Sequence, residues 1–341
     1  MCIDTNIYTM GIRSLTQTVK KYSINSIDKN NLYKLSGKKV AVDASLIIYQ
    51  QLLGNNKLFR NEDGKITNHI VGLFYKIINY MSLNIELIFV FDGVPPENKK
   101  ECIQKRKVKS LEAKELSQNA DNYEDKVKYE KQSIRLTKEM ITDTKNLLKF
   151  LGISYIQLDI GEAEAYASEL CRIGYVDYLL SEDMDSLVYG CPRLIRNCID
   201  RTLKRKGVVS IFHYDRIIND LNLTEDQFIE FCIFCGCDYC EPIPKVGNIT
   251  ALKLFHKYKT INEIIQHTEY IFPENYLNNF LSAKENFLAL RNKINTNELN
   301  IHRSQLNIFE LEKFLLGEIQ INEKKYRNTI KKLNNIYKGI S

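Results

Sequence analysis

The sequence predicts an α/β protein in which helices flank a central, mostly parallel sheet. Three short apolar runs, at residues 39–42, 87–91 and 178–180, alternate with longer helical stretches. Runs this short that are apolar on both faces are typical of strands buried within a parallel sheet. Their alternation with helices favours strand–helix–strand units, whose helices cover the two faces of the sheet.

The helical stretches differ in character along the chain. Residues 67–82 have the pattern of an amphipathic helix between the first two strands. Residues 99–150 are highly charged and contain almost no Gly or Pro, which indicates helices with exposed basic faces. From Leu223 onward the pattern is helical, with a Gly- and Pro-containing turn at residues 242–247, and no second sheet is expected there.

Composition indicates an intracellular globular protein. The chain has 341 residues, 44% of them hydrophobic and 26% charged, which suits one large domain or two tightly joined ones. Its net charge of +6 is consistent with nucleic-acid binding. No apolar run could cross a bilayer, and the N-terminus lacks a secretory signal. We expect a monomer without membrane association, in the nucleus or, if the protein is viral, at a cytoplasmic replication site.

Each of the three predicted strands leads into acidic residues. Asp43 follows the first strand, Asp92 the second, and Glu182 and Asp183 the third. Active sites of parallel sheets lie at the carboxyl ends of their strands. A single acid at this position can instead cap the following helix, and capping is an equally good explanation for any one of them. Acids at all three strand ends are better explained by a shared site.

The acidic residues form a pattern that favours divalent metal ions. Carboxylates that lie close together repel one another and resist ionisation unless cations lie between them. Oxygen donors without His or Cys favour Mg²⁺ or Mn²⁺ over zinc, and so many carboxylates suit two ions, the arrangement used for phosphodiester cleavage. Scattered surface acids are the alternative, but five of the seven lie in or beside apolar segments. The seven candidates are Asp43, Asp92, Glu162, Glu164, Asp183, Asp185 and Asp238.

Six blocks in this order resemble the flap endonucleases, a family of structure-specific 5′ nucleases. They are MGIRSL (10–15), VDAS with IYQ (42–50), FDGVPP (91–96), GEAEA (161–165), EDMD (182–185) and GCDYC (236–240). The resemblance extends from about Met10 to about Leu333. It implies a PIN-like 5′-nuclease fold with a central sheet, a helical arch and a helix–two-turn–helix element that binds DNA.

The resemblance also implies an organisation of the chain and of its metal ligands. Residues 10–110 would form the N-terminal nuclease region with the start of the arch, 111–150 the arch and connecting helices, 151–240 the internal nuclease region, and 241–341 the helix–two-turn–helix element with the C-terminal helices. The first ion would be held by Asp43, Asp92, Glu162 and Glu164. The second would be held by Glu164, Asp183, Asp185 and, through water, Asp238.

Basic and aromatic residues near these acids have expected roles in catalysis. Lys99 and Arg106 are two helical turns apart and lie near one helix face. By resemblance they would reach the scissile phosphate, where their charge would stabilise the transition state. A solvated helix face or a nuclear-import signal at residues 105–109 is the alternative. Tyr49, on the helix after Asp43, would stack on the base beside the scissile phosphate, or belong to the core.

The remaining DNA contacts are expected from backbone amides. The loop at 243–248 resembles the helix–two-turn–helix turn, in which Lys245 and Gly247 would contact duplex phosphates. Gly11 would lie near the DNA at the start of the family's mature chain. Two departures, Lys245 in place of a Gly and Pro242 in place of a Ser that seats a monovalent cation, leave K⁺ binding at this loop open.

Three further features are interpreted more conservatively. The motif C-x-x-C-x-C-x-x-C at 232–240 could indicate a zinc site or an iron–sulfur cluster. We expect instead that these thiols are buried like apolar side chains and bind no zinc or iron. The segment 305–309 faintly resembles a sliding-clamp-binding box. It is expected to pack in the core, and with no clamp-binding tail after it, clamp binding should be weak or absent. Two alternatives stay open for residues 1–9: they are a native extension before Met10, or Met10 is the true first residue of the protein.

The expected function is structure-specific 5′ flap endonuclease and 5′–3′ exonuclease activity in DNA replication and repair. The partner is DNA with a 5′ flap or a junction of single and double strands. Two alternatives stay open: a sibling exonuclease, junction-resolving or excision-repair nuclease with the same fold, and an inactive DNA-binding scaffold. The presence of all seven acids with Lys99 and Arg106 argues against the scaffold.

Overall fold

The computed structural model describes residues 12, 14–54, 57–96, 99–197 and 201–338. The chain folds into two compact units that interleave along the sequence. The first unit comprises residues 1–31, 95–102 and 164–296, and the second comprises residues 32–94, 103–163 and 297–341.

The sheet of the first unit has four strands in the order β1, β7, β6, β5. The strand β7 (Val208–His213) pairs antiparallel with both β1 (Ile27–Asn31) and β6 (Arg193–Asn197). The strand β5 (Tyr178–Leu180) pairs parallel with β6, with Leu179 opposite Leu194. The strand β7 lies between two neighbours, and residues 208–212 are buried on both faces, which suits their Val, Ile and Phe side chains.

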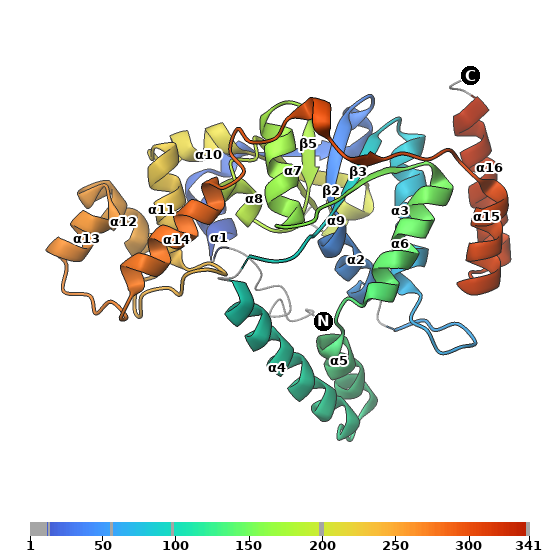
Figure 1. The fold of residues 1–341 in the computed structure, drawn as a ribbon, viewed down its shortest axis with the longest axis horizontal. Coiled ribbons are helices and arrows are strands. Elements are labelled where there is room, and N and C mark those ends of the chain that lie inside the picture. Colours follow the sequence, from blue (N-terminus) through green and yellow to red (C-terminus); the bar gives the residue numbers. More distant parts are fainter. Residues whose placement is uncertain (1–11, 13, 55–56, 97–98, 198–200, 339–341) are drawn as a thin grey trace. The chain divides into compact units, whose positions relative to one another are not determined.

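The helices of the first unit surround this sheet and extend from it. The helix α11 begins with a capping box, in which Thr224 and Gln227 satisfy each other's backbone amides. Its buried face, with Phe228, Phe231 and Phe234, packs against α12 and α14 (Figure 1). The helical elements are α1 (Leu15–Tyr22), η2 (Ile24–Ser26), α7 (Ala163–Arg172), α8 (Asp185–Val188), α9 (Arg201–Arg205), α10 (Tyr214–Asp220), α11 (Glu225–Cys235), α12 (Asn248–Tyr258), α13 (Ile261–His267), α14 (Tyr276–Leu288) and η5 (Thr296–Glu298).

The sheet of the second unit has the order β2, β3, β4, β8. The strands β2 (Lys39–Asp43), β3 (Glu86–Phe91) and β4 (Ser154–Gln157) pair in parallel, with Val42 opposite Phe89. The short strand β8 (Ile301–His302) joins β4 antiparallel at the edge. Parallel pairing brings the carboxyl ends of β2 and β3 to the same edge of this sheet.

Helices also pack around the second sheet. Thr67 precedes α3, whose buried face carries Ile70, Leu73, Phe74 and Ile77 toward α2, α6 and α16, so the amphipathic helix predicted at 67–82 is confirmed. The helical elements are η3 (Leu32–Leu35), α2 (Ala44–Leu53), α3 (Asn68–Ser82), α5 (Tyr123–Ser133), α6 (Lys138–Leu151), α15 (Ile308–Glu312), the π-helix η6 (Lys313–Glu318) and α16 (Glu323–Lys338).

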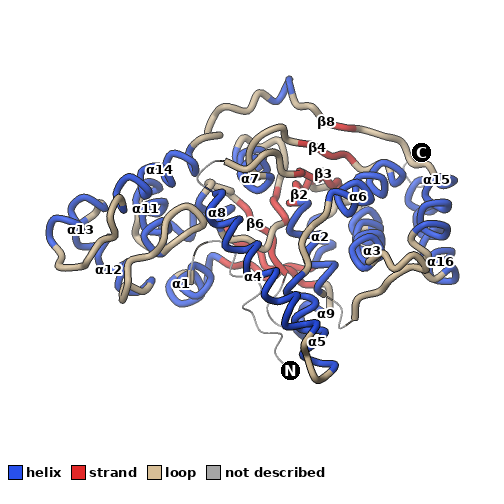
Figure 2. The backbone as a smooth tube through the Cα atoms, turned by 60° about the horizontal axis from the view of Figure 1, so that its bottom comes forward, coloured by secondary structure: helices blue, strands red, loops and turns tan. Residues whose placement is uncertain are grey.

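The predicted charged helices are present. The helix α4 (Lys100–Gln118) begins in the first unit and continues into the second, where it lies beside α5 (Figure 2). Ser110 Oγ donates to the carbonyl of Ser133 at 2.8 Å, and Ser117 Oγ donates to that of Lys126 at 3.1 Å. The two helices therefore form a hairpin joined by side-chain hydrogen bonds.

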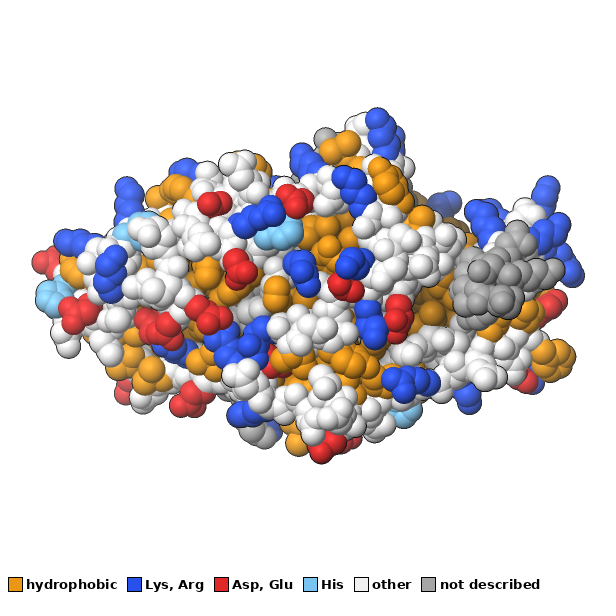
Figure 3. All heavy atoms as spheres, turned by 90° about the horizontal axis from the view of Figure 1, so that it is seen from above, with side chains coloured by type: hydrophobic (Ala, Val, Ile, Leu, Met, Phe, Trp, Pro, Cys, Tyr) orange, Lys and Arg blue, Asp and Glu red, His pale blue; other side chains and the backbone are white. Residues whose placement is uncertain are grey.

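The α/β class predicted from the sequence is confirmed, and all three predicted strands are present. Of the pairings within the two units, three are parallel and three antiparallel, so the sheets are mixed. The expectation of helices alone after Leu223 was wrong at β8. Among the described helices, none combines the length and apolar character needed to span a membrane. On the face in Figure 3, basic and acidic side chains are interspersed.

Candidate active site

The turn after β5 builds an acidic cluster in the first unit. Asp183 Oδ1 accepts a hydrogen bond from the amide of Asp185 at 3.0 Å, and the amide of Asp183 donates to Ser181 Oγ at 3.1 Å. Asp185 is 2% exposed and accepts from the amide of Ile12 at 2.6 Å. These bonds fix both carboxylates at the start of α8.

Glu164, in the first turn of α7, completes the cluster. One carboxylate oxygen from each of Glu164, Asp183 and Asp185 lies within 4.8 Å of the other two. Burial and the neighbouring negative charges raise the pKa of Asp183, and they raise the pKa of Asp185 well above its usual range. A divalent cation would relieve this repulsion, and three hard oxygen donors fit Mg²⁺ or Mn²⁺ better than zinc. We call these residues the acidic trio.

Asp238 and Lys99 extend the site within the same unit. Asp238 follows α11, past Gly236 with a φ of 100°. The Lys99 ammonium lies 3.3 Å from Asp238 Oδ2, and Cys102 Sγ donates to Asp238 Oδ1 at 3.5 Å. The charge of Asp238 raises the pKa of Asp183 and that of Lys99 lowers it, so both residues act on the acidic trio.

The second unit presents the other predicted acids at the ends of β2 and β3. Asp43 Oδ1 accepts from the amide of Leu46 at 3.1 Å, so Asp43 caps α2, and the capping interpretation is correct for it. Asp92 is exposed; it accepts from the amide of Ala163 at 2.8 Å and from Ser45 Oγ. Glu162 is half-buried and directly precedes Ala163.

Glycine is required where the two acid-bearing loops of the second unit meet. The amide of Gly93 donates to the carbonyl of Gly161 at 3.0 Å, and that of Val94 donates to Asp159 at 2.9 Å. A Cβ at Gly93 would lie 2.5 Å from the backbone carbonyl carbon of Asp159. Only glycine permits this approach, which places Asp92 and Glu162 on joined loops.

Tyr49 and Arg106 lie on the elements where they were predicted. Tyr49 is half-buried on α2, and its hydroxyl accepts from the amide of Leu136 at 3.1 Å. Arg106 is half-buried on α4, seven positions after Lys99, whereas Lys107 and Lys109 are exposed. The hydroxyl contact orients the Tyr49 ring.

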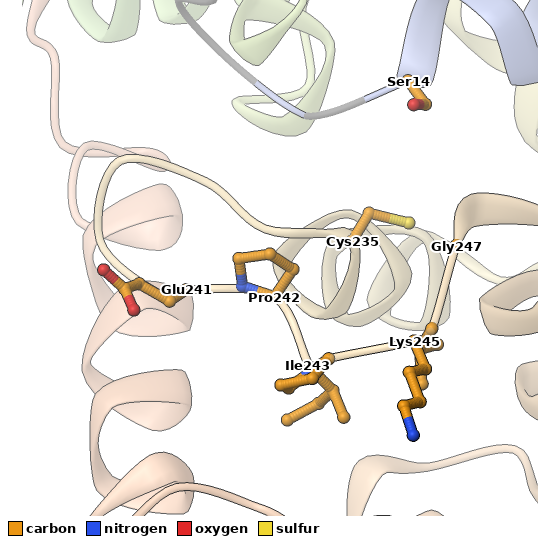
Figure 4. Close-up of a pocket in the computed structure, with 9 residues that line it drawn as sticks. Ser14, Cys235, Glu241, Pro242, Ile243, Lys245 and Gly247 are labelled. Atoms are coloured by element: carbon orange, nitrogen blue, oxygen red, sulfur yellow. The ribbon is translucent and has the colours of Figure 1, made fainter.

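The predicted helix–two-turn–helix loop, which connects α11 and α12, lines an open pocket of about 690 Å³ (Figure 4). The amide of Val246 donates to the carbonyl of Ile243 at 3.2 Å, and Lys245 has a φ of 66° in this turn. Gly247 is the N-cap of α12. Asn248 Nδ2 donates to Thr18 Oγ1 at 2.6 Å, which joins α12 to α1.

Two expectations fall outside what the structure describes, and one was wrong. Gly11 and residues 1–9 lie outside the described residues. Residues 305–309 do not pack in the core: Phe309 is 76% exposed. The buried face of this helical segment is instead formed by Leu311, Phe314 and Leu315, which lie about one helical turn further along.

Comparison with known proteins agrees with this fold. The XPG N-terminal domain matches residues 10–113, and the XPG I-region matches residues 152–238. Flap endonuclease 1 of Glycine max is 35% identical over 334 residues, covering 95% of this chain and 86% of the relative. Flap endonuclease 1 of Homo sapiens is 34% identical over 339 residues, covering 97% and 88%.

Solved structures give the same result. Flap endonuclease-1 from Methanococcus jannaschii superimposes with a TM-score of 0.69 at 27% identity, covering 97% of this chain and all of that one. Human GEN1 in complex with Holliday junction DNA shares the fold, with a TM-score of 0.66 at 23% identity, covering 96% and 78%. Fold and acidic site define a nuclease of the XPG class. The chain belongs to the flap endonuclease family and is a structure-specific nuclease of DNA replication and repair.

Proposed function

We propose that this nuclease uses two Mg²⁺ ions, which Mn²⁺ can replace, to cut DNA where a duplex meets a 5′ single-stranded flap, and that it also degrades 5′ ends. The observation that carries the proposal is the acidic trio, whose oxygens lie within 4.8 Å of one another. When bound, the ions lower the pKa of water and stabilise negative charge on the oxygens of the reacting phosphate.

The seven acids predicted from the sequence are assigned to this reaction. Asp183 and Asp185 are held by backbone amides, so their carboxylates are preorganised for a cation. In the second unit, the amides of Leu46 and Ala163 orient Asp43 and Asp92 in the same way. We assign Asp43, Asp92, Glu162 and Glu164 to the first ion, and Glu164, Asp183, Asp185 and, through water, Asp238 to the second.

The basic residues stabilise charge that develops at the phosphate. Lys99 lies beside Asp238, and the charge of Lys99 already acts on Asp183. Its ammonium and the Arg106 guanidinium would contact the scissile phosphate. Tyr49, oriented through its hydroxyl, would stack on the adjacent base.

Duplex binding is assigned to backbone amides and charge outside the reaction centre. The amides at the start of α12, with Gly247 as N-cap and Lys245 exposed beside it, would contact phosphates without reading sequence. Gly11 would add a contact near the site. We further propose that the protein acts as a monomer in the nucleus or at a cytoplasmic replication site, with weak or no binding to a sliding clamp.

The test compares 5′-labelled single-flap, double-flap, nicked, Holliday-junction and single-stranded substrates, each with Mg²⁺ and with EDTA. Mg²⁺-dependent cutting near the base of the 5′ flap, faster than on the other substrates, is the expected result. Preferential cutting of junctions or plain ends would instead assign the chain to a sibling nuclease. DNA binding without cleavage in Mg²⁺ would contradict the proposal. Repeating the flap reaction with added KCl tests whether the loop at 243–248 uses K⁺.

A further inference from the structure

The Lys99 ammonium has an aromatic neighbour as well as an acidic one. Its Nζ atom lies 5.8 Å from the centre of the Tyr239 ring and 3.3 Å from Asp238 Oδ2. We propose that Tyr239 is a positioning residue for Lys99, held in place by Tyr189 and Phe287. The inference rests on the proposed function, because it concerns how Lys99 is presented to the phosphate.

The ring lies within the distance at which a cation–π attraction operates, about 6 Å. The Lys99 side chain is 14% exposed, so water screens this attraction less than it would at the surface. A lysine has a long flexible stem, so fixing its position costs rotamer entropy. Because the ring already favours one position of the ammonium, less rotamer entropy is lost during catalysis.

The Tyr239 ring is itself fixed from two sides. Its hydroxyl lies 3.0 Å from that of Tyr189. The Phe287 ring, on α14, contacts Tyr239 edge-on at 5.5 Å between centres, and it contacts Tyr189 at 4.9 Å. Tyr189 and Phe287 are 7% and 3% exposed, so this aromatic platform is part of the core of the first unit.

The platform and the acidic trio share an element. Asp185 begins α8, and Tyr189 directly follows its last residue, with its amide donating to the carbonyl of Asp185 at 3.0 Å. Asp238 and Tyr239 are neighbours in the chain. The carboxylates of Asp185 and Asp238 and the rings of Tyr189 and Tyr239 therefore come from the same two short segments, which fixes the position of Lys99 relative to the trio.

A ring suits this position better than a second carboxylate would. Asp238 holds the ammonium by charge and competes with a phosphate for it. The ring is uncharged and attracts the ammonium through its π face, so it keeps Lys99 near the trio while the ammonium hydrogens stay available to a phosphate. When Asp238 contributes through water to the second ion, as proposed, Tyr239 still contacts the Lys99 ammonium and holds it in place.

The first test measures single-turnover cleavage of a 5′-flap substrate by full-length Tyr239→Leu and Tyr239→Phe. Tyr239→Leu should slow cleavage on the order of tenfold while leaving the Kd for DNA nearly unchanged. Tyr239→Phe keeps the ring and should restore the rate to within about threefold of wild type. Tyr326→Phe is the matched control: it removes a buried tyrosine hydroxyl on α16, in the second unit and outside the platform, and should cleave normally.

A double-mutant cycle separates positioning from general damage. In the Lys99→Ala background, Tyr239→Leu should slow cleavage no further, because its effect acts through the missing ammonium. An equal slowing in both backgrounds would overturn the inference. The same double-mutant cycle can be measured on the Tm in EDTA, where the Tm losses of Lys99→Ala and Tyr239→Leu should be non-additive. Additive Tm losses would show that the ring and the ammonium do not interact.

These outcomes are distinguishable from a failure of the proposed function. The wild-type substrate comparison decides whether flaps are cut, and the cycle can be measured on whichever DNA the enzyme cuts fastest. If Lys99→Ala cleaves as fast as wild type, Lys99 has no catalytic role and the inference about Tyr239 is overturned, while the nuclease function stands. The Tm cycle in EDTA requires no cleavage at all.

Discussion

At the scale of single residues, the strand-end acids accept hydrogen bonds from amides at the starts of helices and are candidate oxygen donors to a metal ion. Asp43 and Asp183 accept from amides at the starts of α2 and α8, and Asp92 accepts from Ala163 at the start of α7. Each carboxylate is oriented by a helix amide and stabilised by the helix dipole. These contacts leave the carboxylates as candidate metal ligands, so capping and metal binding need not be alternatives.

Lys99 is the residue whose removal should affect chemistry most selectively. Lys99→Ala removes a charge beside the acidic trio and should slow single-turnover cleavage on the order of 100-fold with little change in the Kd for DNA. Lys107→Ala, on the exposed face of α4, is the control and should cleave at the wild-type rate. A loss of affinity at an unchanged rate would make Lys99 a phosphate contact alone.

His69 should make the fold sensitive to acid. It is fully buried on α3, and its two ring nitrogens have no hydrogen-bond partner among the described residues. Burial, with a smaller effect of the Lys65 charge, lowers the pKa of His69 from 6.5 to about 4. The neutral ring therefore contributes stability that is complete above pH 6.5 and is lost as the pH falls toward 4, by up to about 1.4 kcal/mol per pH unit.

Urea unfolding of His69→Leu between pH 7 and pH 4.5 tests this account. The variant should lose less stability over this range than wild type. His267→Gln changes an exposed histidine on α13 and should follow the wild-type curve. Parallel curves for wild type and His69→Leu would show that His69 has the same pKa in the folded and unfolded states.

The residues of the site were predictable from the sequence to different degrees. Six of the seven acids were found because they lie at strand ends or in short acid pairs, and Asp238 because it lies in the GCDYC block; all of these signals are local in sequence. Tyr239 was visible in the GCDYC block, but its contact with Lys99 joins residues 140 positions apart. Ser45, which donates to Asp92, was missed for the same reason. No local pattern reports such contacts.

At the scale of elements, the turn before α12 adopts a conformation unusual for its sequence. Lys245 has a φ of 66°, which costs an L-residue with a side chain about 1–2 kcal/mol. Lys245→Gly should therefore raise the free energy of unfolding by about 0.5–1 kcal/mol, because relief of strain exceeds the added freedom of the unfolded chain. Lys253→Gly, inside α12, should instead lower it by about 1 kcal/mol. A loss of stability in Lys245→Gly would show that the lysine side chain supports the turn.

The cysteines of α11 and the loop after it are predicted to bind no metal. Cys232 and Cys235 are buried on α11, and burial raises the pKa of Cys235 to about 12, which disfavours a thiolate ligand. Elemental analysis of the purified protein should find less than one zinc or iron per chain. A stoichiometric amount that is lost in Cys232→Ala would contradict this prediction.

Strands were harder to predict than helices. The runs at β2, β3 and β5 stood out because both of their faces are buried. The edge strand β1 has the polar sequence IDKNN, β4 has the sequence SYIQ with one buried residue, and β8 has two residues, so no apolar run marks them. Pairing with neighbours far along the chain, and not local propensity, makes these segments strands.

At the scale of the whole molecule, the interleaving of two units was not visible in the sequence. The first unit is built from three separate segments of the chain, and no change in composition marks the boundaries between segments of different units. The predicted sequential regions followed the order of motifs, whereas compact units are set by contacts between distant segments. Fold class and family were predictable from motif order, but strand order was not.

The most direct test of the metal-site assignment is Asp183→Asn, measured for both cleavage and DNA binding. Cleavage of the 5′-flap substrate in Mg²⁺ should fall on the order of 100-fold or more, because the acidic trio loses one of its charges. Binding in EDTA should be unchanged or tighter, because the site becomes less negative. Asp215→Asn, an exposed acid on α10, should match wild type in both measurements. Normal cleavage by Asp183→Asn, or a parallel loss of binding and cleavage, would contradict the account.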